Sequence, residues 1–313
     1  MSGKNATETL EADAAGIARA ARILQSGGLV AVPTETVYGL AARADDAAAI
    51  AKIYAAKGRP GFNPLIVHVD TLDQAEALAE FSDLARQIAQ AAWPGPLTLI
   101  LPRRVDAPLA EAISAGLPTI ALRMPAHPVM RALIRESGCA LAAPSANLSN
   151  AISPTTAAHV AASLGGRIDA ILDAGPCENG LESTILAVRH DGTLEILRPG
   201  PFDPEELRRF GVIADKASAK IEAPGQLRSH YSPGKPVRLD AQAPLPDEYM
   251  IGFGAARGHC TLSASGDLAE AAANLYGALH EAAASPLPRI AVAPIPAEGV
   301  GMAINDRLRR AAA

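Results

Sequence analysis

The chain has 313 residues, of which 49% are hydrophobic and 19% are charged, and its formal net charge at pH 7 is −5. This length and composition support one large or two modest globular domains and exclude global disorder. Aromatic residues make up only 4%, which argues against a stacking platform for single-stranded nucleic acid. Because the net charge gives no general attraction to phosphate backbones, any polyanion site must be a local cluster of Lys and Arg.

The cysteines and the N-terminal segment bear on the cellular compartment. Cys139, Cys177 and Cys260 lie far apart and form no Cys/His pattern at metal-ligand spacing, so we expect neither a disulfide framework nor a zinc site. The polar start of the chain contains no signal-peptide pattern, and no apolar run approaches the ~18 residues of a spanning helix. These features predict a cytoplasmic protein that does not contact a membrane.

Up to about residue 205, helical patterns alternate with strand patterns. Apolar residues at spacings of three and four indicate helices, and short apolar runs bounded by Gly and Pro indicate strands. This alternation is typical of an α/β sheet domain. The expected helices are 14–25, 46–56, one from about 72, and 85–92, and the expected strands are 29–32, 65–69, 97–101, 119–123, 140–143, 170–173 and 183–188.

The pattern changes after about residue 198. A short helix over 204–210 precedes a polar stretch, 215–236, that is typical of an interdomain linker. A second alternating region follows, with strands at 249–253 and 289–293 and helices at 266–284 and 304–310. We therefore predict a large α/β domain at 12–205, a linker or lid segment at 206–236 and a small α/β domain at 237–313.

Two nucleotide-binding patterns can be assessed directly. No P-loop pattern occurs in the chain. The segment Gly252–Gly258 follows a predicted strand and superficially resembles a dinucleotide fingerprint. Its third glycine comes one residue late and no βαβ unit precedes it, so a turn at the strand end is favoured over a cofactor site.

A basic cluster follows the second helix. Lys57 lies at the predicted helix end, and Arg59 and Asn63 lie in the Gly/Pro loop before strand 65–69. A cation at a helix C-terminus complements the helix dipole, which explains Lys57 alone. A rigid loop that presents Arg and Asn also suits phosphate oxygens, since Arg offers a planar pair of donors and Lys a point charge. The cluster is equally compatible with capping and with a phosphate site.

Polar loops leave several predicted strands, at 33–40, 143–147 and 153–156. In open α/β sheets, ligands bind beyond the carboxyl ends of strands. Ser153 before Pro154 also predicts a helix N-cap with proline at the first helical position. Capping explains any single serine, but three such loops in one domain favour a ligand site.

Two charged or titratable residues lie within the strands. His68 is in an apolar strand, where a histidine is typical of a hydrogen-bonded core residue. Arg123 ends a strand, and an arginine that enters a domain interior needs an anion, either a side-chain carboxylate or a ligand. No Ser/His/Asp arrangement is evident from the order of these groups, and no carboxylates cluster at metal spacing.

Several distinctive motifs occur in order over about residues 15–203. They are P-T-E-T-V-Y-G-L at 33–40, K-x-R-P-x-x-N-P-L at 57–65, P-G-P-L-T at 94–98, R-M-P-A-H-P at 123–128, A-P-S-A-N-x-S at 143–149, S-P-T at 153–155 and S-T-I at 183–185. Together they resemble the YrdC-like family. The segments G-Q-L-R-S-H-Y-S-P at 225–233 and E-G-V-G-M-A-I-N-D-R-L-R-R-A at 298–311 resemble the linker and C-terminal domain of its long members.

The resemblance implies a fold and a reaction. The fold is a twisted mixed sheet with a concave substrate face, followed by a small Rossmann-like α/β domain. The reaction joins L-threonine, bicarbonate and ATP into threonylcarbamoyl-AMP and releases pyrophosphate. Mg²⁺ accompanies ATP on its phosphates, with no protein metal ligand and no organic cofactor. A tRNA threonylcarbamoyl-transferase complex then acts downstream, on the adenosine next to the anticodon.

The resemblance also implies roles for particular residues. Lys57 and Arg59 are the expected catalytic residues, Tyr231 is the expected lid, and Arg123 is the expected partner of the threonine carboxylate. Asn150 stands where many members have glycine, and because Asn tolerates a left-handed backbone we expect the turn to be preserved. The expected ATP-binding residues are Lys57, Arg59, Asn63, Thr119, Ser145, Asn147, Ser153 and Arg198, and the expected threonine-binding residues are Thr34, His68, Arg123, Ala143 (through its backbone) and Ser183.

Three alternatives accompany this interpretation. An RNA-binding module could use a basic concave face, and the synthase itself could make a weak contact with RNA, although the acidic balance and few aromatics count against both. A carbamoyl-transferring enzyme of hydrogenase maturation would need acylphosphatase and zinc-finger-like segments, which this chain lacks. An inactive family member is disfavoured by the intact cluster of Lys57, Arg59 and Asn63.

Overall fold

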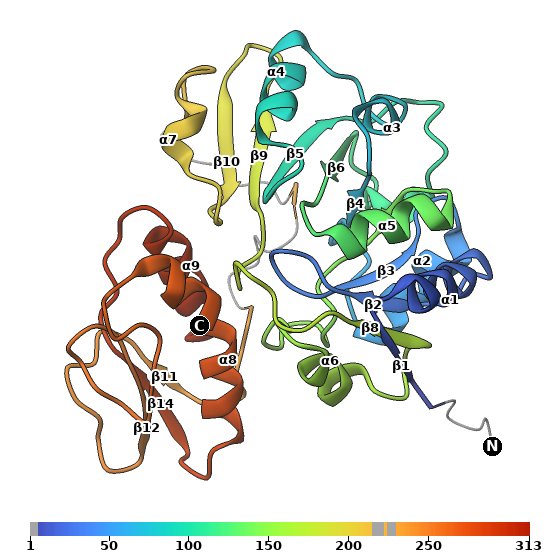
Figure 1. Ribbon diagram of the computed structural model, residues 1–313. Coiled ribbons are helices and arrows are strands. Elements are labelled where there is room, and N and C mark those ends of the chain that lie inside the picture. Colours follow the sequence, from blue (N-terminus) through green and yellow to red (C-terminus); the bar gives the residue numbers. More distant parts are fainter. Residues whose placement is uncertain (1–5, 215–221, 224–229) are drawn as a thin grey trace.

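The computed structural model describes residues 6–214, 222–223 and 230–313. Its described strands form two sheets, one in each lobe of Figure 1. The larger sheet is mixed, with the strand order β1-β8-β2-β3-β7-β4-β6-β5-β9-β10, and the smaller one is parallel, with the order β11-β14-β12-β13. The predicted fold class, a mixed α/β domain followed by a small α/β domain, is confirmed.

The large domain contains the following described elements. Its strands are β1 (Glu8–Glu11), β2 (Val30–Val32), β3 (Gly39–Arg43), β4 (Ile66–His68), β5 (Leu97–Pro102), β6 (Thr119–Arg123), β7 (Leu141–Ala142), β8 (Ala170–Asp173), β9 (Thr184–Val188) and β10 (Leu194–Arg198). Its helices are α1 (Ala14–Gln25), α2 (Ala47–Lys57), α3 (Leu72–Glu76), α4 (Asp83–Ala92), the 3₁₀ helix η1 (Glu111–Ile113), α5 (Pro128–Ser137), α6 (Ala157–Leu164) and α7 (Pro204–Leu207).

Helix α2 shows how local chemistry sets these boundaries. The Asp46 carboxylate accepts hydrogen bonds from the N–H groups of Ala48 and Ala49, which satisfies donors at the helix start. Gly58 ends the helix with a left-handed φ of 60°, a conformation that glycine adopts without strain. Both signals are present in the sequence, and the predicted helix differs from the observed one by a single residue at each end.

The predicted N-cap at Ser153 is wrong. Helix α6 begins at Ala157 and is capped by Thr156, whose hydroxyl accepts from the His159 N–H. Ser153 is fully buried, and its hydroxyl donates to the Glu182 carboxylate at 2.5 Å instead. The Ser153 hydroxyl therefore bonds a distant residue, Glu182, and does not cap the helix as the Ser-Pro pair suggested.

Several elements were not predicted. Strand β1 is polar and pairs with β8 at the edge of the sheet, so it carries no apolar run. Strand β3 follows the polar turn at 33–38 and pairs with β2. Helix α5 begins at Pro128 and ends at Gly138, with φ of 70°, so both of its boundary signals are present in the sequence. The predicted helix 204–210 is shorter in the structure, where α7 ends at Leu207.

Side chains alternate between the two faces of the large sheet, as strand geometry requires. Ala31, Leu40 and Val67 face the main core, together with residues of α2, α4 and α6. The intervening positions, among them Val30 and Ala41, face the other side, which α1 and α5 cover. These two helices cover only the β1–β7 part of that second face. On its remaining part, apolar residues of β4, β5, β6, β9 and β10 form a smaller buried cluster with Ala223 of the linker.

The small domain follows the predicted linker, of which residues 215–221 and 224–229 lie outside the described residues. Buried residues of α8 and α9 pack on its parallel sheet. After β12, Phe253 N–H donates to Ala256 O at 3.0 Å, so the glycine-rich segment forms the expected strand-end turn. The elements are β11 (Val237–Arg238), β12 (Glu248–Gly252), β13 (Cys260–Thr261), α8 (Leu268–Ala284), β14 (Arg289–Val292) and α9 (Gly301–Ala311).

Helix α8 contacts the large domain. The rings of His159 in α6 and His280 in α8 stack with centroids 3.9 Å apart, and His280 Nε2 donates to Ser153 O at 3.2 Å. A Cβ at Gly180 would lie 2.5 Å from Ala273 Cα, so glycine lets the loop before β9 lie directly against α8. Within the described ranges, no helix is both long and apolar enough to cross a membrane.

Candidate active site

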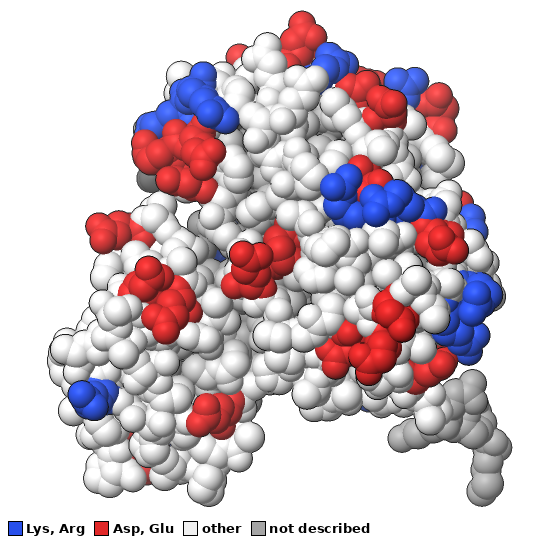
Figure 2. All heavy atoms as spheres, viewed as in Figure 1, with Lys and Arg blue, Asp and Glu red and all other residues white. Residues whose placement is uncertain are grey.

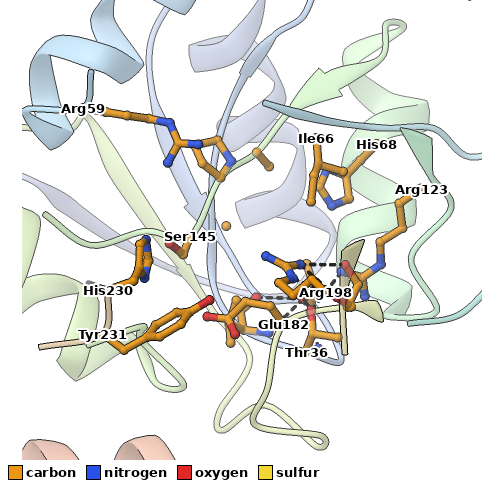
Figure 3. Close-up of a pocket in the computed structure, with 16 residues that line it drawn as sticks. Thr36, Arg59, Ile66, His68, Arg123, Ser145, Glu182, Arg198, His230 and Tyr231 are labelled. Carbon is orange, nitrogen blue, oxygen red and sulfur yellow. Dashed lines mark hydrogen bonds between the residues drawn. The ribbon is translucent and has the colours of Figure 1, made fainter. Parts of the chain in front are cut away.

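A cavity lies on the second face of the large sheet, where strand ends, the 143–145 loop and residues 230–231 meet. In Figure 3, Arg59 enters from one side, and His68 and Arg123 lie on the other. The sequence-predicted residues that line it are Thr34, Arg59, His68, Arg123, Ala143, Ser145, Ser183, Arg198 and Tyr231. It is also lined by Thr36, Val37, Gly39, Ile66, Pro144, Glu182 and His230.

The turn after β2 is held by its own hydroxyl groups. Thr34 Oγ1 accepts from the N–H groups of Thr36 and Val37 and donates to Val37 O at 2.7 Å. Thr36 Oγ1 lies 2.8 Å from Thr34 Oγ1 and accepts from Arg123 Nη1 at 2.9 Å. The P-T-E-T-V motif therefore builds a rigid turn whose hydroxyls face the cavity.

Arg123 forms an ion pair with Glu35 of the same turn. Its Nη2 lies 2.6 Å from Glu35 Oε1, and its Nε donates to Gly95 O at 3.1 Å. Burial would raise the pKa of Glu35, but the charge of Arg123 outweighs it and lowers the pKa, so Glu35 is ionised. Of the two anions considered for Arg123, the structure contains the side-chain carboxylate. A ligand carboxylate at the same guanidinium remains a prediction.

His68 is at the end of β4, beside Arg123 in register. Burial and the charge of Arg123 lower its pKa to about 3, so the imidazole is neutral at pH 7. Among the described residues, its Nδ1 has no hydrogen-bond partner although the atom is buried. The ring is buried, as expected of a core histidine, but it also lines the cavity and its Nδ1 is not satisfied by the described residues.

Lys57 connects a helix end to a loop. Its buried ammonium donates to Ser145 O at 2.5 Å and to Asn147 O at 2.6 Å, so it fixes the A-P-S-A-N loop and does not line the cavity. Burial and the charge of Arg59 lower the pKa of Lys57 well below its usual value. The cation thus has a role in fixing the loop in addition to its place at the helix end, and its contact with phosphate remains a prediction.

Arg59 reaches the cavity from the loop after α2. Its Nε donates to Asn63 O at 3.2 Å and its Nη2 to Pro64 O at 2.9 Å, which fixes the guanidinium orientation. Burial lowers its pKa to about 10, so it stays charged at pH 7. Asn63 does not line the cavity, and in the described part of the chain its buried Oδ1 has no partner.

Arg198 and Ser183 form a pair on the β9 and β10 side. Arg198 Nε and Nη2 donate to Ser183 O at 3.1 and 2.9 Å, and Nη2 also donates to Ser183 Oγ at 3.1 Å. Ser183 Oγ lies 2.7 Å from Thr98 Oγ1. Burial lowers the pKa of Arg198. The arginine and the serine are therefore preorganised at one wall of the cavity.

Thr119, Asn147 and Ser153 do not line the cavity. Thr119 starts β6 and lies about 13 Å from Arg123 at its other end, on the same face of the strand. Asn147 Nδ2 donates to Ala151 O at 2.8 Å and so orders the loop. In that loop Asn150 adopts a φ of 67°, which confirms the preserved left-handed turn.

Sequence reasoning missed Glu182 and two of its partners, Tyr276 and Arg307. The Glu182 carboxylate accepts from Ser153, from the Tyr276 hydroxyl at 2.9 Å and from Arg307 Nε at 2.8 Å. The available signal was an acidic residue directly before S-T-I, but its partners in α8 and α9 carry no local signal. Tyr231, the predicted lid residue, is buried beside this group, with its ring centroid 5.7 Å from that of Tyr276.

The cavity as a whole is suited to anions. Arg59, Arg123 and Arg198 present three guanidinium groups, and the two nearby carboxylates, Glu35 and Glu182, are each paired with an arginine. Over the ranges that the structure describes, no group of three or more His, Cys, Asp or Glu residues is arranged to hold a metal ion. The arrangement can bind and orient a polyanion beside a smaller polar ligand.

Comparisons with known proteins agree with this geometry. The family described as "Telomere recombination", of Sua5, YciO and YrdC proteins, matches residues 22–200. The family described as "Threonylcarbamoyl-AMP synthase, C-terminal domain" matches residues 202–313. A threonylcarbamoyl-AMP synthase of Bacillus subtilis is 41% identical, over 98% of this chain and 95% of its own. One of Pyrococcus abyssi is 36% identical, over 93% of this chain and 92% of its own.

Solved structures also show similarity to this family. The crystal structure of P. abyssi Sua5 complexed with L-threonine has a TM-score of 0.88 and 34% identity, and covers 98% of this chain and 97% of its own. E. coli YciO, with a TM-score of 0.57 and 20% identity, shares the fold over 66% of this chain and 99% of its own. The chain therefore belongs to the Sua5–YciO–YrdC family, in the form that carries the additional C-terminal domain.

Proposed function

We propose that this protein is an L-threonylcarbamoyladenylate synthase, which converts L-threonine, bicarbonate and ATP into threonylcarbamoyl-AMP and pyrophosphate. The observation that carries the proposal is the convergence of Arg59, Arg123 and Arg198 on one cavity, in a chain that matches synthases along nearly its whole length. The RNA-binding alternative is not favoured, and on the face in Figure 2 basic and acidic side chains are intermixed.

The chemistry requires no protein nucleophile. The threonine amine combines with bicarbonate to give a carbamate and water, and a carbamate oxygen then attacks the α-phosphorus of ATP while pyrophosphate leaves. The protein has to position two anions and stabilise the charge of the triphosphate. Arg59 and Arg198 supply fixed positive charge for that purpose, because backbone carbonyls hold both guanidinium groups. Lys57 contributes indirectly, since it fixes the Ser145 loop.

Threonine would bind at the other side of the cavity. Arg123 is the proposed partner of its carboxylate, and the ion pair with Glu35 keeps the guanidinium aimed there. The neutral His68 ring offers Nδ1, an acceptor or donor without a partner among the described residues. Thr34, Ser183 and the backbone of Ala143 complete this proposed threonine site.

Mg²⁺ would enter as part of the ATP substrate. Both carboxylates next to the cavity are paired with arginines, so the protein groups present suit phosphate better than a bare cation. When bound, Mg²⁺ neutralises phosphate charge and assists the departure of pyrophosphate. We further propose a cytoplasmic reaction, in keeping with the free cysteines, whose product is consumed by a tRNA threonylcarbamoyl-transferase complex.

The test is pyrophosphate release from ATP and Mg²⁺, with threonine and bicarbonate omitted in turn. We expect release to require both. Arg59→Ala should lower the rate about 100-fold or more, the effect typical of removing a charge-stabilising donor. Arg104→Ala is the matched control, because within the described part of the chain the Arg104 side chain is paired with Asp106 on the surface and with no other residue. Release that needs neither substrate, or an Arg59→Ala rate equal to the control, would contradict the proposal.

A further inference from the structure

The second domain supplies an unusual buried cation to the large domain. Arg307 in α9 has no exposed surface, and its Nε donates to Glu182 Oε2 at 2.8 Å. A buried arginine is stable only when its charge is matched and its donors are satisfied. Arg307 Nη1 donates to Asp306 at 2.8 Å, and its Cζ lies 5.4 Å from the Tyr231 ring centroid. The second domain therefore holds this guanidinium rigidly against Glu182.

Glu182 connects this contact to the cavity. Its carboxylate lines the cavity directly before Ser183, while both of its oxygens are occupied by Ser153, Tyr276 and Arg307. Burial would raise the pKa of Glu182, but the charges of Arg307 and Arg198 outweigh it and lower the pKa to about 2. The cavity wall thus contains the fixed negative charge of Glu182, which Arg307 of the second domain neutralises.

The charge of Glu182 matters because of what the cavity binds. Arg198 is a second cation near Glu182, and it is a proposed ATP ligand. Without Arg307, the carboxylate would pair with Arg198 and would repel an incoming triphosphate. Figure 3 shows Glu182 and Arg198 at the same side of the cavity, and the charge of Arg198 acts on the Glu182 carboxylate.

We propose that Arg307 of the second domain is a positioning residue of the ATP site: it keeps Glu182 paired and oriented so that Arg198 serves the nucleotide. This inference rests on the proposed synthase function. The second domain then influences substrate binding through one ion pair, between Arg307 and Glu182. Tyr276 of α8 supports the same carboxylate, so both helices of the second domain act on it.

The test compares Arg307→Met with Arg309→Met in steady-state pyrophosphate release. Arg309 is exposed on the same helix and is the matched control. We expect Arg307→Met to raise the KM for ATP at least tenfold, with a smaller change in kcat, and Arg309→Met to leave both near wild type. Far-UV circular dichroism and thermal unfolding verify that each variant is folded.

A second variant separates positioning from simple loss of structure. In Glu182→Gln/Arg307→Met both charges are absent, so Arg198 is not captured and no charge is left buried alone. We expect its KM for ATP to return to within about threefold of that of Glu182→Gln. The inference is overturned if the KM for ATP of Arg307→Met equals that of Arg309→Met, or if the double variant binds ATP no better than Arg307→Met.

Failure of the proposed function would look different. In that case wild type and Arg309→Met would show no release that depends on threonine and bicarbonate. The affinity for ATP is then measured by calorimetry on the same proteins, which requires no turnover. A tenfold weaker affinity in Arg307→Met alone would still support the positioning role, and equal affinities, or no ATP binding by the wild type, would overturn it.

Discussion

Asn150 lies in a left-handed turn, a backbone conformation that favours glycine. Its φ of 67° lies in the left-handed region, where a β-carbon is unfavourable but the short Asn amide is tolerated. Its carbonyl accepts from Ser232 N–H at 2.8 Å, so the turn also connects the 143–150 loop to the segment beside Tyr231. The backbone conformation at this position is therefore maintained by a tertiary contact.

Asn150→Ala should destabilise the protein by about 1 kcal/mol, because alanine adopts a positive φ less readily than asparagine. Asn150→Gly should be close to neutral, since glycine accepts this backbone without strain. Urea denaturation at pH 7 measures both. An alanine variant as stable as the glycine variant would show that the left-handed conformation carries no cost here.

At the scale of elements, α2 and the 143–150 loop form one unit through Lys57. The ammonium at the helix end satisfies two loop carbonyls, those of Ser145 and Asn147. These two hydrogen bonds anchor to the helix a loop that has little secondary structure of its own. The same unit presents Arg59 and Ser145 to the cavity.

Lys57→Met should lower the free energy of unfolding by about 1–3 kcal/mol, the range for leaving buried carbonyls without donors. Lys52→Met is the matched control, since Lys52 lies on the exposed side of the same helix and donates to a single carbonyl, Gly27 O. Its cost should be about 1 kcal/mol or less. Chemical denaturation compares the two, and equal losses would refute a special role for Lys57.

For the whole molecule, the contact between α6 and α8 is sensitive to acid. Burial and the neighbouring His280 lower the pKa of His159 to about 4, and burial lowers the pKa of His280. The folded state thus binds protons less readily than the unfolded chain between the unfolded value of 6.5 and about 4. The contribution of this histidine pair to stability is therefore complete above pH 6.5 and is lost as the pH falls through this window.

His159→Gln should reduce that loss. Between pH 7 and pH 5 the wild type should lose about 1 kcal/mol more unfolding free energy than the variant, after allowance for the partial exposure of the ring. Denaturant titrations of both proteins at the two pH values give the difference. A variant that loses as much as the wild type would place the acid sensitivity elsewhere.

Prediction from the sequence succeeded where the signals are local. Helix α1 and strand β8 have the predicted bounds, and the motif residues Thr34, Arg59 and Arg123 lie together at the cavity. Prediction failed where the role of a side chain depends on a partner far away in the sequence. Ser153 caps no helix because Glu182 takes its hydroxyl, and the link from Glu182 to Arg307 spans 125 positions, so no local pattern reveals it.

His230 and Tyr231 line the cavity, and Tyr276 and Arg307 hold its Glu182 wall, yet all four follow the large sheet in chain order. A ribosome makes the chain from its N-terminus, and domains fold in the order in which they emerge. The strands of the large domain can therefore pair while this wall is still missing. We therefore expect the pocket of a nascent chain to remain incomplete until the later-made domain docks against Glu182.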